Sequence, residues 1–366
     1  MKIIMMKMSK RMKLGFCLLI SMFLVSQITA AQYFLICTEK GLKIYSVSGK
    51  NWQAWDYVRT LEKDSGVSSA GFNSDGTLFY THSSKRSAFA DIADTIHFYE
   101  VPKYGNMRAI TTPTVTIEKG MITHIYSAGF NPNDRTFYIC CQKSPKRVVN
   151  VFELKDTSLK FLYQIKDFSP SSIVFSPADK TTLIGFFGPG IFIYRSKLIS
   201  NLSNAENKEP LDLSPHSMHT IGFLLKGGFS PDGTVFFVLS HNRLIFYKVE
   251  KMYNEHGNLY LGGFYDGTGE AKYHNGGFLD NEHFFICSNL GVKIYQVPSC
   301  NTWEKDSISE SSFKEIKVLE NGVPCSAAVL SPVYTTATQD NIKELSTDQD
   351  KAKKTYSDAT IHIQAD

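Results

Sequence analysis

The sequence lacks the local motifs by which several enzyme classes are recognised. Its 366 residues contain no GxSxG, no phosphate-binding P-loop and no HExxH. The seven cysteines form no CxxC pair and no Cys/His spacing suited to zinc. We therefore predict no catalytic residue, no metal and no cofactor. The argument against catalysis is weak, because an enzyme built from repeats can draw its catalytic groups from separate repeats.

Sustained helical periodicity is also missing, and tryptophan is scarce. No stretch keeps apolar residues at the spacing of an amphipathic helix. The chain has 26 Phe and 18 Tyr against 3 Trp, and apolar residues make up 43% of it. Such a composition suits strands and is sufficient for a sizeable core. A chain of this length is either two ordinary domains or one large repeat fold.

The apolar run near the N-terminus is too short to span a membrane. A basic region precedes the 12-residue apolar segment 14–25, and small residues follow up to Ala31. This order is typical of a secretory signal peptide, whereas a spanning helix needs about 20 apolar residues. We predict that residues 1–31 are removed and that no stable membrane anchor remains. The mature protein would be exported, either periplasmic or extracellular.

No strong charge of either sign remains once that segment is removed. Residues 1–31 hold five of the 39 Lys and Arg residues and no Asp or Glu, so the mature chain has 34 basic residues against 35 acidic ones. Nucleic-acid binding proteins usually present a marked excess of basic residues. We therefore predict no nucleic-acid partner.

A unit of about 50 residues recurs along the chain. Each unit has a short apolar strand ending in a turn, an apolar second strand, a third strand ending in an aromatic pair or its equivalent, and often a visible fourth strand. The first strand and its turn occur at residues 68–77, 126–136, 171–181, 226–234, 275–283 and 325–332. Four strands in such a period, repeated around a ring, form a β-propeller. We predict an all-β propeller of four-stranded blades.

The turn after the first strand has a chemical reason, which SPDGT at 230–234 shows best. Proline presets its own φ, the aspartate side chain bonds nearby backbone groups, and glycine accepts a positive φ. Because this turn recurs, imperfectly, at the same place in each unit, it supports the repeat more strongly than a single Pro-Asp-Gly would.

The repeat resembles the WD40-type propellers. The match is best over residues 42–83, where LKIYSV, YVRTLE and VSSAGFNSDGTLFYTHS follow that family's strand order. At the level of pattern it covers most of residues 33–332. The family's Trp-Asp and Gly-His dipeptides are absent from their usual positions. The hydrogen-bond network that the resemblance implies is then missing, and we expect packing to compensate.

The two ends of the repeat region predict how the ring closes. Tyr33 already lies in a second strand, and its missing first strand is supplied by 325–332. This favours six blades over residues 32–332, followed by a polar tail at 333–366. A seventh, incomplete blade is the alternative, because residues 333–337 and 359–363 resemble strands.

The cysteines allow two interpretations. Cys37, Cys140 and Cys287 occupy the same apolar strand position in three units, which favours buried free thiols acting as small hydrophobic residues. Export makes disulfides possible, and the predicted closure of the ring places Cys37 close to Cys325. A Cys37–Cys325 disulfide is therefore a candidate.

All three tryptophans lie in loops between third and fourth strands, which vary most among the units. Trp52, Trp55 and Trp303 would emerge on one face of the ring, with the first and last blades as neighbours. Exposed aromatic side chains on a rigid scaffold suggest a binding patch. The alternative is that they cover the outer core beneath those loops.

These observations favour a binding protein. We predict an exported, monomeric β-propeller that acts as a scaffold for a protein or glycan partner, without catalysis. The alternative is a propeller hydrolase or lactonase with a metal or carboxylate site at the central channel. Carboxylates converging at the centre of the ring would favour the enzyme, and a loop face bearing tryptophan would favour binding. The functional argument rests on fold analogy.

Overall fold

The structure is a computed structural model, and it describes most of the repeat region. The described residues are 31–48, 51–85, 93–101, 107, 115–117, 124–131, 136–143, 146–155, 158–165, 172–175, 177, 182–187, 190–195, 211–212, 224–240, 243–249, 261–266, 272–298, 312–332 and 360–361. Within them, no helix is long and apolar enough to cross a membrane. The predicted signal peptide lies outside them except for Ala31.

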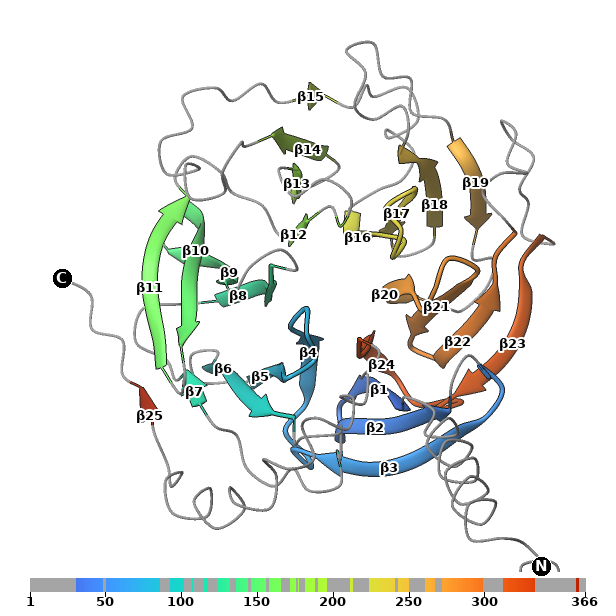
Figure 1. Ribbon diagram of the computed structural model, residues 1–366, viewed down its shortest axis with the longest axis horizontal. Coiled ribbons are helices and arrows are strands. Elements are labelled where there is room, and N and C mark those ends of the chain that lie inside the picture. The colour runs from blue at the N-terminus through green and yellow to red at the C-terminus, as the bar shows by residue number, and fades with distance from the viewer. Residues whose placement is uncertain are drawn as a thin grey trace, which may run out of the picture.

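The described strands form six sheets of four or five strands, set around a common centre (Figure 1). We number the sheets I to VI and give each from its innermost strand outward. Sheet I consists of β24 (Cys325–Leu330), β1 (Ala31–Thr38), β2 (Gly41–Ser48) and β3 (Trp55–Leu61). Sheet II consists of β4 (Val67–Phe72), β5 (Leu78–Lys85), β6 (Ala93–Glu100), β7 (Val115–Ile117) and β25 (Thr360–Ile361). Sheet III consists of β8 (His124–Phe130), β9 (Thr136–Lys143), β10 (Lys146–Lys155) and β11 (Ser158–Ile165).

Sheets IV to VI follow in the same order. Sheet IV consists of β12 (Ser172–Phe175), β13 (Thr182–Phe187), β14 (Gly190–Arg195) and β15 (Leu211–Asp212). Sheet V consists of β16 (Leu224–Phe229), β17 (Val235–Ser240), β18 (Arg243–Lys248) and β19 (Leu261–Asp266). Sheet VI consists of β20 (Tyr273–Phe278), β21 (His283–Ser288), β22 (Gly291–Gln296) and β23 (Lys314–Leu319). The all-β propeller that the repeat predicts is confirmed.

Strands from both ends of the repeat region complete sheet I. β1 pairs antiparallel with β24, with Phe34 opposite Leu330. The Tyr33 amide donates to Ser331 Oγ at 2.8 Å, and the Ser331 amide donates to the Tyr33 carbonyl at 2.7 Å. β25 instead pairs in parallel with β7 and so extends sheet II. The alternative of a seventh, incomplete blade is therefore contradicted for Thr360 and Ile361, because they pair with the edge of an existing sheet.

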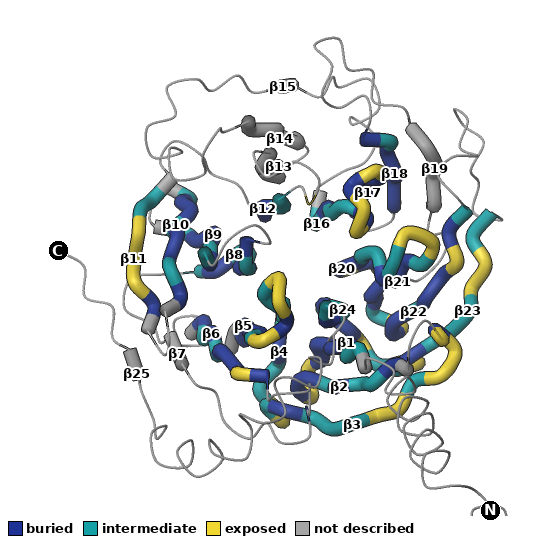
Figure 2. Tube along the Cα trace, viewed as in Figure 1, coloured by how far each residue is buried: buried dark blue, intermediate teal, exposed yellow. Residues whose placement is uncertain are grey.

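The core lies between the faces of neighbouring sheets. β17 is buried along its whole length, which explains why second strands have continuous apolar runs rather than alternation. Tyr80 on β5 meets Phe137 on β9 with ring centroids 5.1 Å apart, and Phe34 on β1 meets Phe285 on β21 at 5.2 Å. Outer strands such as β3 and β11 carry exposed residues, as do the turns that follow β4, β16 and β20 (Figure 2). Packing between second strands thus holds adjacent sheets together.

Glycine on the inner strand makes room for an aromatic ring on the second strand. A Cβ at Gly228 would lie 2.6 Å from the Phe237 ring, within the same sheet. Where the inner strand has valine at the position equivalent to Gly228, the opposing residue is aliphatic, and Val329 for example faces Leu35. The repeat thus keeps the combined size of each pair roughly constant. The glycine–aromatic pairs are Gly71–Tyr80, Gly129–Tyr138, Gly228–Phe237 and Gly277–Phe285.

The predicted turn chemistry is confirmed at residues 230–234. Asp232 Oδ1 accepts hydrogen bonds from the Thr234 amide at 3.0 Å and from Ser230 Oγ at 2.6 Å. Gly233 has φ of 72°, in the left-handed region that favours glycine. The turn is therefore stabilised locally and places β17 beside β16.

Candidate functional site

The inner strands share an irregularity at one end. The register shifts by one residue in β4, β8, β16, β20 and β24, which leaves one unpaired bulge residue in each. These residues are Ser68, Tyr126, Leu225, His274 and Ser326. A β-bulge redirects side chains and is frequent near active sites. The bulges therefore mark this end of the inner strands as a place to look for function.

The residue after each bulge occupies an equivalent position on its inner strand, and Ser172 occupies that position on β12, whose pairing with β13 shows no bulge. We call this set the central ring: Ser69, Ser127, Ser172, Lys226, Asn275 and Ala327. Each is paired with an equivalent position of its second strand, for example Asn275 with Cys287 and Ala327 with Cys37. The ring thus consists of three hydroxyl groups, one amide, one ammonium group and one methyl group.

Lys226 and Asn275 are the unusual members of the central ring. Lys226 is half-buried, and burial lowers the pKa of its ammonium group from 10.5, while the Cys287 and Cys37 thiols oppose the shift. Among the described residues its ammonium group has no hydrogen-bond or ion-pair partner. Asn275 is 5% exposed, and its Oδ1 has no partner there either. Two adjacent sheets thus present unpaired polar groups at the same level.

Glu62 joins sheet I to sheet II through its side chain. It follows β3 with φ of 47°, a left-handed conformation. Its carboxylate accepts hydrogen bonds from Thr81, from Ser83 Oγ at 3.0 Å and from the Tyr99 hydroxyl at 2.7 Å, and lies 3.2 Å from His97 Nδ1. Burial alone would raise the pKa of Glu62, but hydrogen bonds from His97, Thr81 and Tyr99 outweigh it and lower the pKa to about 2. The carboxylate therefore stays charged and fully bonded.

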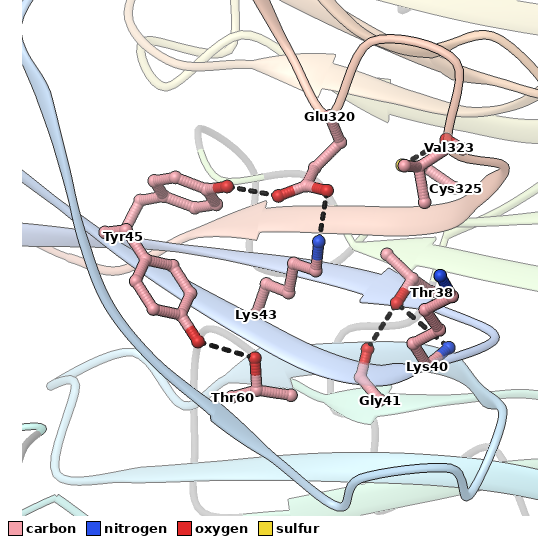
Figure 3. Close-up of polar contacts among 10 residues, drawn as sticks. Thr38, Lys40, Gly41, Lys43, Tyr45, Thr60, Glu320, Val323 and Cys325 are labelled. Atoms are coloured by element: carbon pink, nitrogen blue, oxygen red, sulfur yellow. Dashed lines mark hydrogen bonds and ion pairs between the residues drawn. The ribbon is translucent and has the colours of Figure 1, made fainter.

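Glu320 makes the same kind of connection from sheet VI to sheet I. It follows β23 with φ of 54°, and its carboxylate accepts hydrogen bonds from Lys43 and Tyr45 on β2 (Figure 3). Lys43 and Tyr45 occupy the positions that His97 and Tyr99 occupy on β6. We call Glu62 and Glu320 the turn carboxylates. We expected packing alone to replace the missing family network, and these polar contacts correct that expectation.

Ser68, His82 and Asp94 form a hydrogen-bonded chain in sheet II. Ser68 Oγ lies 3.0 Å from His82 Nδ1, and His82 Nε2 lies 3.3 Å from Asp94 Oδ1. Asp94 also accepts a hydrogen bond from the Ile125 amide of sheet III at 2.6 Å. Hydroxyl, imidazole and carboxylate in series can activate a serine. Ser68 Oγ also lies 2.8 Å from the His82 carbonyl, a competing acceptor for its proton.

Trp52 anchors the loop between β2 and β3 onto sheet VI. Its Nε1 donates to Asp280 Oδ2 at 2.9 Å, and Asp280 Oδ1 lies 2.8 Å from His283 Nδ1. Trp52 is 4% exposed. The Trp55 Nε1 donates to the Trp52 carbonyl, and its ring packs on Phe34 at 5.1 Å. The loop is thus fixed across the boundary between sheets I and VI.

The predicted tryptophan patch is not an exposed surface at the positions that the structure describes. Trp52 is buried and Trp55 is half-buried, because both rings fill the space beneath their loop. Trp303 lies outside the described residues. The exposed residues of the loop are polar or small: Asn51, Gln53 and Ala54. Any binding by this loop would therefore use those residues rather than the indole rings.

The described cysteines are all free and buried. Cys325 lies opposite Thr38 rather than Cys37, so the candidate Cys37–Cys325 disulfide is absent although both residues lie on adjacent strands. Burial, with a smaller contribution from Glu320, raises the pKa of Cys325 to about 12. Burial also raises the pKa of Cys37 and Cys287. The thiols therefore remain protonated and behave as small hydrophobic groups.

Sequence reasoning did not single out the turn carboxylates, the Ser68–His82–Asp94 chain or Lys226. The available signal for Lys226 was its departure from the serine or small residue that other units have at that position. Within the described part of the chain, no group of three or more His, Cys, Asp or Glu side chains is placed to hold a metal ion.

Several solved structures have the same fold. The chain is similar to a structure of the nidogen/laminin complex, with a TM-score of 0.53, 9% identity and coverage of 83% of this chain and 100% of that one. It is similar to TolB from Acinetobacter baumannii, with a TM-score of 0.52, 10% identity and coverage of 83% of this chain and 67% of that one. It is also similar to a putative 6-phosphogluconolactonase from Bacteroides fragilis, with a TM-score of 0.50, 11% identity and coverage of 84% of this chain and 99% of that one.

These similarities establish the propeller fold alone. The sequence identities are too low to assign a function or a family. No family model and no curated protein matches the chain. The resemblance to the WD40-type propellers therefore stays a prediction.

Proposed function

We propose that the protein is an exported, six-bladed β-propeller, one blade for each sheet, that acts as a monomeric binding scaffold for a protein partner. A glycan is the alternative ligand. The binding surface would be the face that carries the loops between third and fourth strands. The observation that carries the proposal is the fixed position of residues 51–54, which Trp52 holds against Asp280.

A loop fixed in this way is suited to recognition. Immobilising a loop before binding reduces the entropy lost when the complex forms. Gln53 and Ala54 are exposed on this loop, while its backbone is held by the Ala54 amide donating to the Asn51 carbonyl at 3.0 Å. The fold supports this role by analogy, because the nidogen/laminin structure shows a similar fold in a protein–protein complex.

The test is capture of partners by the mature protein, residues 32–366, from an extracellular or periplasmic fraction. We expect the double variant Gln53→Arg and Ala54→Arg to reduce capture of a specific partner at least about tenfold. Glu39→Arg is the matched control: it changes the charge by the same amount, is exposed, and lies in the turn at the other end of β2. Equal capture by both variants and the parent would contradict the proposal.

A second candidate, hydrolysis, is favoured by the Ser68–His82–Asp94 chain. If Ser68 acts as a nucleophile, Ser68→Ala should abolish turnover of p-nitrophenyl esters by the mature protein. Ser326→Ala is the control, because Ser326 occupies the equivalent bulge on β24 but donates to the Val67 carbonyl at 2.8 Å instead of facing an imidazole. Absence of turnover in the parent protein would remove this candidate.

A further inference from the structure

We propose that the central ring binds a small organic anion bearing hydroxyl groups, held by Lys226 and Asn275. The ligand class is a polyhydroxy carboxylate or a phosphorylated polyol. This site is separate from the loop face proposed for partner binding, and it would give the propeller a small-molecule ligand at its centre.

Within the part of the chain that the structure describes, no carboxylate forms an ion pair with the ammonium group of Lys226. A charge removed from water without a partner is costly unless it is paired, and burial already lowers the pKa of Lys226. The Cys287 and Cys37 thiols are close enough to influence that pKa, yet burial raises their own pKa values, so they stay neutral. An anion at this position would supply the missing charge.

The neighbouring sheet supplies a group for hydroxyl recognition. Asn275 Oδ1 is buried without a partner among the described residues, and an unpaired buried acceptor costs about 1–3 kcal/mol. β16 and β20 are adjacent inner strands (Figure 1), and both residues lie one position after a bulge. A ligand hydroxyl donating to Asn275 would satisfy this oxygen while the acidic group of the same ligand meets Lys226.

The central ring and its bulges indicate hydroxyl chemistry and access. Ser69, Ser127 and Ser172 place hydroxyl groups at the same level on three other inner strands. The bulge residue His274, directly before Asn275, is exposed. This end of β20 therefore meets solvent, while the next residue inward is buried. A small ligand could reach the ring from that end.

The experiment measures binding of four probes to the mature protein by calorimetry. Sodium gluconate and glycerol 3-phosphate carry both a charge and hydroxyl groups, sodium acetate carries only the charge, and glucose carries only hydroxyl groups. We expect gluconate or glycerol 3-phosphate to bind at least tenfold more tightly than acetate and glucose. The proposal is overturned if neither anion binds, or if acetate or glucose binds as tightly.

Variants assign the binding to the central ring. Lys226→Met should weaken binding of the anionic probe at least tenfold, and Asn275→Ala should weaken it while leaving the weak binding of acetate unchanged. Lys314→Met is the control, because it removes an exposed lysine from the outer strand β23. Lys226→Gln replaces Lys226→Met if the latter does not fold. Unchanged affinity in the Lys226 variant would refute the site.

The same probes separate this proposal from the binding scaffold. The double variant Gln53→Arg and Ala54→Arg should bind the anion as the parent does. Loss of capture by this variant together with retained anion binding supports both proposals. Equal capture by variant and parent, with anion binding retained, leaves only the central site. Loss of capture by the variant, with no anion binding by the parent, leaves only the scaffold.

Discussion

The turn carboxylates show how single residues connect neighbouring sheets. Glu62 and Glu320 occupy the same turn position in two units, and each reaches a tyrosine and a basic residue on the third strand of the next sheet. Both have a positive φ, which is uncommon for residues other than glycine. The bonds that each carboxylate accepts offset this local strain.

Replacing Glu62 tests its contribution as a function of pH. Its pKa is lowered from 4.5 to about 2, so its contribution to the free energy of unfolding is fully present above pH 4.5 and is lost as the pH falls towards 2. A shift of this size corresponds to about 3 kcal/mol. We expect Glu62→Gln to destabilise the protein by about this amount at pH 7, measured by urea unfolding.

The difference between parent and Glu62→Gln should shrink when the pH is lowered from 7 to 2. Glu39→Gln, an exposed glutamate in a nearby turn, is the control and should change stability by no more than about 0.5 kcal/mol. An equally large loss for the Glu62 variant at both pH values would show that the lost packing, not the charge, is responsible.

The charged form of Lys226 should lower the free energy of unfolding of the protein. Because burial lowers its pKa from 10.5, the folded protein disfavours the charged form, and stability should rise with pH between the lowered pKa and 10.5. We expect Lys226→Met to raise the melting temperature at pH 7 by about 2 °C or more, and the gain to be smaller at pH 10. A lower melting temperature in the variant would indicate stabilising contacts of the lysine chain.

At the scale of the strand, pairing of small and large residues fits the second strand to the inner one. Gly228 leaves no room for a Cβ beside Phe237, and other sheets combine valine with an aliphatic residue instead. We expect Gly228→Val alone to destabilise the protein by about 1–3 kcal/mol through overpacking. The double variant with Phe237→Leu should recover part of that loss, since it recreates the Val329–Leu35 combination.

Urea unfolding of the four proteins in this double-mutant cycle gives the coupling energy. A favourable coupling of about 1 kcal/mol is expected between residues in contact. Additive effects of Gly228→Val and Phe237→Leu would contradict the proposed complementarity.

Strands were more predictable than the polar contacts between them. The turn at 230–234 and the buried second strands could be predicted from local sequence, because the turn depends on residues next to one another in the chain and each second strand is a continuous apolar run. Glu62 is different: its partners lie on β5 and β6 of the next sheet, and nothing in its own turn indicates them. For Trp52 the sequence left an exposed patch and a cover over the core as alternatives, because its partner Asp280 is 228 positions away.

At the scale of the whole molecule, β24 is the strand that closes the ring. It lies between β1 of its own sheet and the inner strands of the neighbouring sheets (Figure 1). Cys325, Ala327 and Ala328 on it are buried. The Ser326 hydroxyl donates to the Val67 carbonyl of sheet II at 2.8 Å. Its removal would expose both the edge of β1 and two core faces.

Truncation separates the role of β24 from that of the tail. We expect residues 32–332 to unfold cooperatively with a melting temperature close to that of 32–366, because the only described strand lost is β25, which contributes a two-residue pairing to β7. Residues 32–323 should not form a stable monomer, since an open β1 edge promotes association. Calorimetry and light scattering measure both outcomes. A cooperative, monomeric 32–323 protein would mean that the other sheets close without β24.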